Sequence, residues 1–357
     1  MREKILGVML IFVPIAIAAE LLHWSPTVVF FASAAAVIPL AGFMGEATEV
    51  LAEKVGPRLG GLLNATFGNM AELIITIIAI RAGQLALVKA SLIGSIMGNI
   101  LLVLGLAILA GGLKNGVQSF DRRAAGLDAT MLILAAIALS VPSIFNHAIE
   151  PDFWGAEKLS LATAVVMIGI YALSIIYLLR SRTPEEHYAG PSVQPSHTAP
   201  KWSTGIAVAI LTASVVGIAA MSEFLLGSIE PVTHALGLSP FFVGIIIIPL
   251  IGNVAEHTVA VQVAIRDDMD LSLSIANGSS LQIALFVAPV LVFISLLMGN
   301  PMALEFNNFE VIALIASSMI AAVIALDGRS NWLEGSMLLA VYLILAIGFF
   351  FLPNSVF

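Results

Sequence analysis

Eleven runs of about 20 mostly apolar residues divide this chain, and they constrain its fold more than any other feature. A helix of that length crosses the hydrocarbon core of a bilayer, which is about 30 Å thick. The runs cover residues 5–22, 26–45, 59–80, 85–113, 124–145, 159–179, 203–227, 241–265, 271–298, 309–326 and 332–352. They predict an all-α integral membrane protein with eleven transmembrane helices.

The composition argues against the other large classes of protein. Residues of the AVILMFWYC set make up 59% of the 357 residues and charged residues only 11%, against roughly 45–50% and 25% in soluble domains. Strands of a membrane β-barrel alternate apolar and polar residues, whereas the run 132–139 is apolar throughout. With no Cys, disulfides and thiolate metal sites are excluded. We expect no cofactor and no nucleic-acid partner, and the sequence leaves the oligomeric state open, including a homo-oligomer in the bilayer.

Lysine and arginine are distributed unevenly between the two sides that alternating spans define. One side holds Arg2, Lys4, Lys54, Arg58, Lys114, Arg122, Arg123, Arg180, Arg182, Lys201, Arg266 and Arg329. The other side holds only Arg81, Lys89 and Lys158. Because positive residues gather on the cytoplasmic side, we predict a cytoplasmic N-terminus and an external C-terminus.

An internal repeat links the two halves of the chain. GNMAE at 68–72 returns as GNVAE at 252–256, an offset of 184 residues that also relates Gly60 to Gly244 and Gly94-Ser95 to Gly278-Ser279. Each copy holds five spans, an odd number, so the second copy should insert upside down, which is typical of transporters. The predicted segments are an extra N-terminal helix (1–25), a first five-helix repeat (26–180), a Pro-rich cytoplasmic linker (181–202) and a second repeat (203–357).

The repeated motif places one carboxylate in the middle of a span in each copy, at Glu72 and Glu256. A carboxylate at this depth costs several kcal/mol and marks a functional site by default. Asn69 and Asn253 lie three residues before these glutamates and share a helix face with them. Helix breaks are expected at the small or proline positions Gly68, Gly94, Gly98, Pro249 and Gly252. Carboxylate, amide and freed backbone oxygens form a ligand set that suits Ca²⁺ better than Mg²⁺, which demands a near-ideal octahedron.

A second polar layer is predicted beside the glutamates. Ser95 and Asn99 lie one turn apart in the fourth span, and Ser279 and Gln282 lie one turn apart in the ninth. Either ion contact or ordinary hydrogen bonding between helices accounts for such residues. A third pair, Glu49 and Glu223, stands near span ends, where a gate and a merely solvated carboxylate are the two interpretations.

His257 follows Glu256, whereas Leu73 follows Glu72. A hydrogen-bonded buried histidine is one interpretation and a proton-binding partner is the other. A third proton bound at His257 would make the exchange sensitive to membrane voltage.

The motifs resemble those of the calcium/proton exchangers of the calcium/cation antiporter superfamily. The resemblance is carried by GLLNATFGN (61–69), GNMAE, GNVAEH and GSSLQIALFVAP (278–289), and it covers all eleven spans. It implies that Glu72 and Glu256 bind the ion and exchange protons, with Asn69, Asn253, Ser95 and Gln282 nearby. Family members often have a strongly acidic helical linker, but here it retains only Glu185 and Glu186. The PEL-type and GSNxxN motifs of sodium/calcium exchangers are absent from the sequence.

We therefore interpret the chain as a secondary antiporter that exports Ca²⁺ in exchange for H⁺ by alternating access. Two carboxylates about 6 Å apart repel by ~3 kcal/mol at an effective dielectric constant near 20, so the empty, doubly ionised site is disfavoured. The alternatives are a sodium-coupled exchanger and, further away, a channel. An intramembrane enzyme lacks support because no Ser/His pair or HExxH motif lies in a span. The expected location is the plasma membrane of a prokaryote, with a vacuolar membrane as the alternative.

Overall fold

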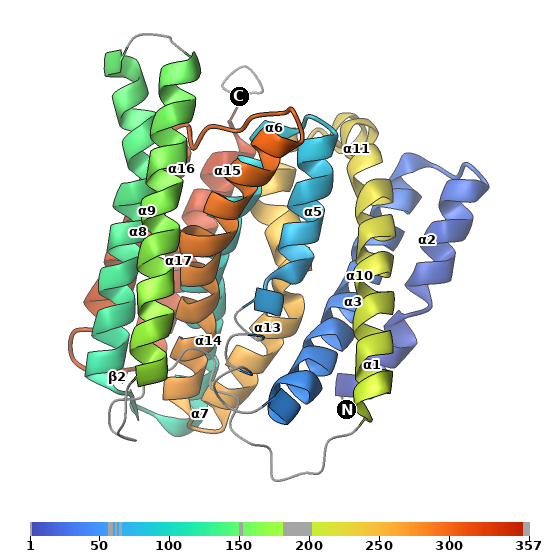
Figure 1. The fold of residues 1–357 in the computed structure, drawn as a ribbon. Coiled ribbons are helices and arrows are strands. Elements are labelled where there is room, and N and C mark those ends of the chain that lie inside the picture. The colour runs from blue at the N-terminus through green and yellow to red at the C-terminus, as the bar shows by residue number, and fades with distance from the viewer. Residues whose placement is uncertain are drawn as a thin grey trace.

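The structure is a computed structural model that describes residues 2–55, 60, 63, 66–149, 153–180 and 202–352. Most of these residues are helical, and the long helices run up and down in one bundle (Figure 1). Nine helices in the described part of the chain are long and apolar enough to cross a membrane. The prediction of an all-α membrane protein is therefore confirmed.

The elements of the first half, in chain order, are α1 (Arg2–Met9), α2 (Phe12–Leu21), α3 (Pro26–Val55), α5 (Met70–Arg81), α6 (Leu85–Met97), the π-helical segment η1 (Gly98–Val103), α7 (Leu104–Asn115), strand β1 (Gln118–Ser119), α8 (Arg122–Ile149) and α9 (Phe153–Arg180). Residues 181–201, which include nearly all of the predicted linker, lie outside the described residues.

The elements of the second half are α10 (Thr204–Gly227), α11 (Ile229–Leu236), α12 (Pro240–Phe242), η3 (Val243–Ile247), α13 (Ile248–Ile265), α14 (Met269–Gln282), η4 (Ile283–Val287), α15 (Ala288–Leu297), α16 (Asn308–Ile324), β2 (Arg329–Ser330) and α17 (Trp332–Phe350). The two short strands pair antiparallel and join the loop before α8 to the loop before α17.

Two of the eleven predicted spans are not among the nine long helices. The span 59–80 contains α5, but much of the segment before Thr66 lies outside the described residues. The span 309–326 corresponds to α16, which is apolar but has only 17 residues. The count of eleven therefore stays a prediction.

The boundaries of the first two spans differ from those predicted. The first span is broken near Leu10 into α1 and α2. The second continues ten residues past its predicted end at residue 45, to Val55. Its last part contains Glu46, Glu49 and Glu53, so apolar character ends before the helix does. Helical hydrogen bonding needs no apolar environment, which is why hydropathy alone sets this end too early.

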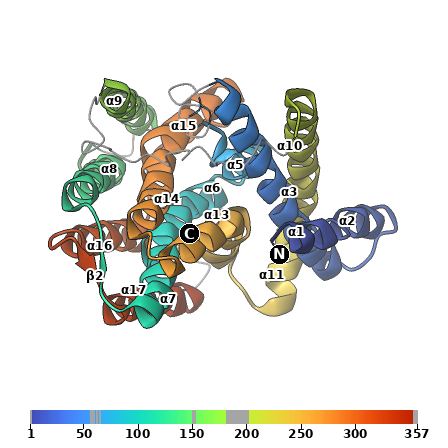
Figure 2. The same ribbon diagram turned by 90° about the horizontal axis from the view of Figure 1, so that it is seen from below.

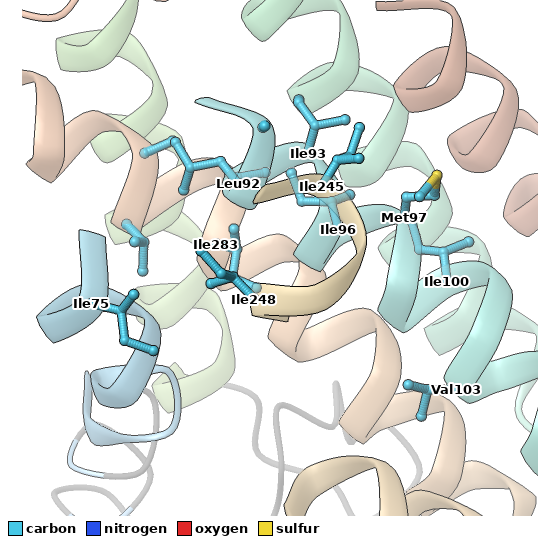
Figure 3. Packing of buried hydrophobic residues seen from close by; sticks show 14 of the residues in the cluster. Ile75, Leu92, Ile93, Ile96, Met97, Ile100, Val103, Ile245, Ile248 and Ile283 are labelled. Carbon is cyan, nitrogen blue, oxygen red and sulfur yellow. The ribbon is translucent and has the colours of Figure 1, made fainter. Parts of the chain in front are cut away.

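The centre of the bundle is formed by α6, α13 and α14, as the view from below shows (Figure 2). On one side of them lie α1, α2, α3 and α10, and on the other side lie α8, α9, α16 and α17. Apolar side chains from both halves meet between the central helices (Figure 3), including Ile75 of α5, Ile93 of α6, Ile245 of η3 and Ile283 of η4. Each of these four side chains is at most 3% exposed. The polar residues of the repeat are thus set among tightly packed apolar ones.

The predicted helix breaks are found at some positions and not at others. Gly68 and Asn69 form a turn just before α5, and Gly98 begins the π-helical segment η1. The predicted break at Gly252 is wrong, because α13 runs through this residue without interruption. Pro249 is also no break, since it lies in the first turn of α13, where a proline's missing amide proton leaves no helical bond unmade. Gly94 lies inside α6, where it provides space for the carbonyl of Ile245.

Candidate functional site

Glu72 and Glu256 lie on the two repeated helices, α5 and α13. Glu72 is in the first turn of α5 and only 4% exposed, and Glu256 is half-buried near the middle of α13. The two carboxylates are near enough to repel each other electrostatically. One oxygen of each, Oε1 of Glu72 and Oε2 of Glu256, is buried and has no hydrogen-bond partner among the described residues. A buried anionic oxygen without a donor is costly, so both atoms are suited to a cation or a proton.

Two matching hydrogen bonds join the halves beside these carboxylates. The hydroxyl of Ser279 donates to Oδ1 of Asn69 at 2.9 Å, and Nδ2 of Asn253 donates to the hydroxyl of Ser95 at 3.4 Å. An offset of 184 residues converts the first residue pair into the second. All four side chains are buried. The structure therefore brings together the amide and hydroxyl residues predicted in each copy.

The other two residues of the predicted second layer extend this network. Nδ2 of Asn99 donates to the Ser279 hydroxyl at 3.0 Å, and Nδ2 of Asn69 donates to Oε1 of Gln282 at 2.9 Å. Ser279 also lies within hydrogen-bonding reach of Glu256. These contacts fit the interpretation of hydrogen bonding between helices, and they also hold the polar side chains around the glutamates.

Two π-helical segments begin beside this network. η1 starts at Gly98 and η4 starts at Ile283, one residue from each other under the 184-residue offset. A π-helical turn widens the helix and is frequent at functional sites. It therefore alters the direction of the helix just beyond the polar residues in each half.

The glycines of the two motifs are in different surroundings. A side-chain carbon at Gly252 would lie 2.9 Å from Oε1 of Glu72, which is closer than such carbons are found. At Gly68 nothing lies within 4 Å of the same position. Gly252 is therefore required for the close approach of α13 to Glu72, whereas Gly68 has open space.

His257 borders a narrow crevice between the two halves. The crevice is also lined by Ser95, Asn253 and Tyr342. Nε2 of His257 is buried and has no hydrogen-bond partner in the described part of the chain. The interpretation of a fully hydrogen-bonded histidine thus lacks a partner at this atom, and its binding of a proton stays a prediction.

The predicted third pair is not part of this network. Glu49 and Glu223 are both exposed, on α3 and α10 respectively. Sequence reasoning overlooked Glu46 on α3, where Oε2 is buried without a hydrogen-bond partner among the described residues. The available signal was its position one helical turn before Glu49. No cluster of three His, Asp or Glu side chains suited to a metal is found in the described residues, so any cation here must also use amide, hydroxyl or backbone oxygens.

The family follows from comparison with known proteins. The model of the family described as sodium/calcium exchanger protein matches residues 25–180 and 206–351. The chain belongs to this family. Within the sodium/calcium exchanger family it is similar to a Ca²⁺/H⁺ antiporter of Synechocystis sp., with 44% identity over 371 residues that cover 99% of each protein.

Two further family members show the same similarity over nearly the whole length. The Ca²⁺/H⁺ antiporter ChaA of Bacillus subtilis is 40% identical over 343 residues, which cover 95% of this chain and 97% of ChaA. The solved structure of native YfkE matches with a TM-score of 0.85 at 37% identity, over 97% of this chain and all of that one. The resemblance to calcium/proton exchangers drawn from the motifs is confirmed.

Proposed function

We propose that this chain is an antiporter that moves Ca²⁺ out of the cytoplasm in exchange for protons. The observation that carries the proposal is the pair of buried carboxylate oxygens, one from Glu72 and one from Glu256, that lack hydrogen-bond partners among the described residues. Relatives named Ca²⁺/H⁺ antiporters, 40% and 44% identical, support it independently.

In this proposal Ca²⁺ binds between Glu72 and Glu256. Two carboxylates supply at most four oxygens, whereas Ca²⁺ takes six to eight, so amides, backbone carbonyls and water complete the shell. The Asn69–Ser279 and Asn253–Ser95 hydrogen bonds support this role by fixing the side chains beside the carboxylates. Ser95, Asn99, Ser279 and Gln282 then orient ligands or bind the ion directly.

Exchange follows from competition between Ca²⁺ and protons for the same oxygens. With Ca²⁺ bound, or with both glutamates protonated, the site is nearly neutral. With neither, two like charges remain in an apolar environment, which is unfavourable. The site therefore crosses between its inward-open and outward-open states only when loaded, and this couples the two flows.

The test is Ca²⁺ uptake into proteoliposomes driven by an imposed pH gradient. We expect uptake that stops when the gradient is collapsed by a protonophore and that does not respond to a sodium gradient. Uptake driven by sodium but not by protons would instead establish the sodium-coupled alternative. Single-channel conductance would indicate a channel.

We further propose eleven spans in two inverted five-helix repeats, 26–180 and 203–357, preceded by an extra helix at 1–25. The two separate matches of the family model, at 25–180 and 206–351, support this division. So do the paired Asn–Ser hydrogen bonds and the nearly matched π-helical segments, since the offset of 184 relates them as it relates the GNxAE motifs.

The proposed topology has a cytoplasmic N-terminus and lies in the plasma membrane of a prokaryote, as the bacterial relatives support. Ser119 and Ala82 are exposed at the ends of adjacent spans. Because the chain contains no Cys, Ser119→Cys and Ala82→Cys each introduce a single thiol. In intact cells an impermeant thiol reagent should label only the Ala82→Cys variant. Labelling of both from outside would contradict the topology.

A further inference from the structure

The end of α13, the helix that carries Glu256, is held by side chains from the first half of the chain. Nε2 of Gln118 donates to the carbonyl oxygen of Ala264 at 2.9 Å, and Nδ2 of Asn115 donates to the same oxygen at 3.2 Å. Asn115 also reaches the carbonyl of Ile265 at 3.3 Å, and Nζ of Lys114 donates to it at 3.1 Å. The last carbonyls of a helix have no intrahelical donors, so these side chains provide the missing partners.

The end of α5, the helix that carries Glu72, is held in the corresponding way by the second half. Nδ2 of Asn300 donates to the carbonyl oxygen of Ile80 at 2.9 Å. Ile80 follows Glu72 by eight residues, and Ala264 follows Glu256 by eight residues. An amide side chain from the opposite half thus caps the same carbonyl in each copy.

The inner cap has a purpose-built space. Gln118 is only 1% exposed, and its Oε1 lies against Gly111 of α7, where any side-chain carbon would overlap it. Nε2 of Gln118 also donates to Oδ1 of Asp267 at 2.9 Å. Glycine at position 111 is therefore what allows the amide to lie between α7 and the end of α13.

The caps lie within mechanical reach of the carboxylates. Eight residues of helix span about 12 Å, or just over two turns. A helix this short is stiff, so a shift or rotation at its end is passed on to its glutamate. Each glutamate helix is tied to the opposite half twice, once at the network of Asn69 or Asn253 and once at its cap.

We propose that Gln118 and Asn300 are positioning residues of the exchange site, which fix the axial and rotational setting of the Glu256 and Glu72 helices. Neither touches the ion. The inference rests on the proposed function, because a Ca²⁺ affinity is the quantity that it predicts.

The experiment measures pH-driven Ca²⁺ uptake by the full-length chain in proteoliposomes for Asn300→Leu and Gln118→Met, each with KM and Vmax determined. Loss of one capping hydrogen bond should raise the KM for Ca²⁺ by about three- to tenfold. Asn300→Gln, which keeps an amide donor, should restore the KM to near the wild-type value. Gly111→Ala tests the inner cap again, by displacing Gln118 without replacing it.

Asn307→Leu is the matched control, because it makes the same substitution in the same loop. Asn307 caps α16, which carries none of the site residues. It should lower the amount of folded transporter, and hence Vmax, while leaving the KM unchanged. If Asn300→Leu and Gln118→Met behave like this control, the two residues are only structural and the proposal is wrong. If wild-type protein shows no pH-driven uptake, the proposed function fails instead. Variants that do not fold while Asn307→Leu does would also overturn the proposal, since the caps would then be structural requirements.

Discussion

α5 and α13 leave the site through the same turn but enter it differently. After α5, the amide of Gly83 donates to the carbonyl of Ile80, and after α13 the amide of Asp267 donates to the carbonyl of Ala264. These turn residues have φ values of 74° and 67°. On the entry side, Gly68 and Asn69 form a turn, whereas Gly252 and its neighbour lie inside a continuous helix.

The entry sides differ although both motifs read GNxAE. Local sequence therefore does not choose between turn and helix here, and the packing around the motif must. Beside Gly252 the carboxylate of Glu72 is in contact, whereas beside Gly68 there is open space. A segment that adopts two structures with one sequence pattern is suited to switching, because the two structures must then be close in free energy.

The largest effect expected concerns the two carboxylates, in which the halves should be equal. Glu72→Gln and Glu256→Gln keep the side-chain shape but remove the charge and the exchangeable proton. Each should reduce pH-driven Ca²⁺ uptake by about 100-fold or more, as loss of an essential group does. Glu230→Gln, an exposed residue of α11 outside the site, should retain wild-type uptake. Substantial uptake by either site variant would show that one half alone suffices.

The second prediction concerns the glycines, in which the halves should differ. Gly252→Ala puts a carbon 2.9 Å from Oε1 of Glu72 and must displace the carboxylate or α13. Since small misplacements at a reacting group are costly, we expect the KM for Ca²⁺ to rise about tenfold or more. Gly68→Ala meets no atom within 4 Å and should change the KM by about twofold at most. Equal effects of the two changes would mean that the difference in packing has no functional weight.

Sequence reasoning recovered the parts of the site that depend on repetition and burial. The offset of 184 residues led to Asn69, Asn253, Ser95 and Ser279, and these four side chains form the two hydrogen bonds between the halves. Hydropathy located the helices because every span must be apolar whatever its partners are.

The remaining features depend on contacts between segments that are distant in sequence. The capping of Ile80 by Asn300 joins residues 220 positions apart, and neither residue is unusual in its local sequence. The continuous helix at Gly252 was missed because glycine permits a break without requiring one. The end of α3 was placed too early because polarity marks the membrane boundary rather than the helix boundary.

The smallest effect expected concerns the shared turn, where one half has glycine and the other has aspartate. A left-handed conformation costs a non-glycine residue roughly 1–2 kcal/mol, and Asn and Asp tolerate it best. Gly83→Ala should therefore lower the free energy of unfolding by about 1 kcal/mol, seen as a lower melting temperature of the purified protein. Asp267→Gly removes that strain but also removes the acceptor of the Gln118 bond, which contributes about 1 kcal/mol, so the two effects should nearly cancel. Asp267→Asn keeps both the acceptor oxygen and the tolerance of positive φ, and it should leave the melting temperature unchanged. A clear gain in stability for Asp267→Gly would mean that the bond from Gln118 to Asp267 contributes little, and that the inner turn is held by the carbonyl of Ala264 alone.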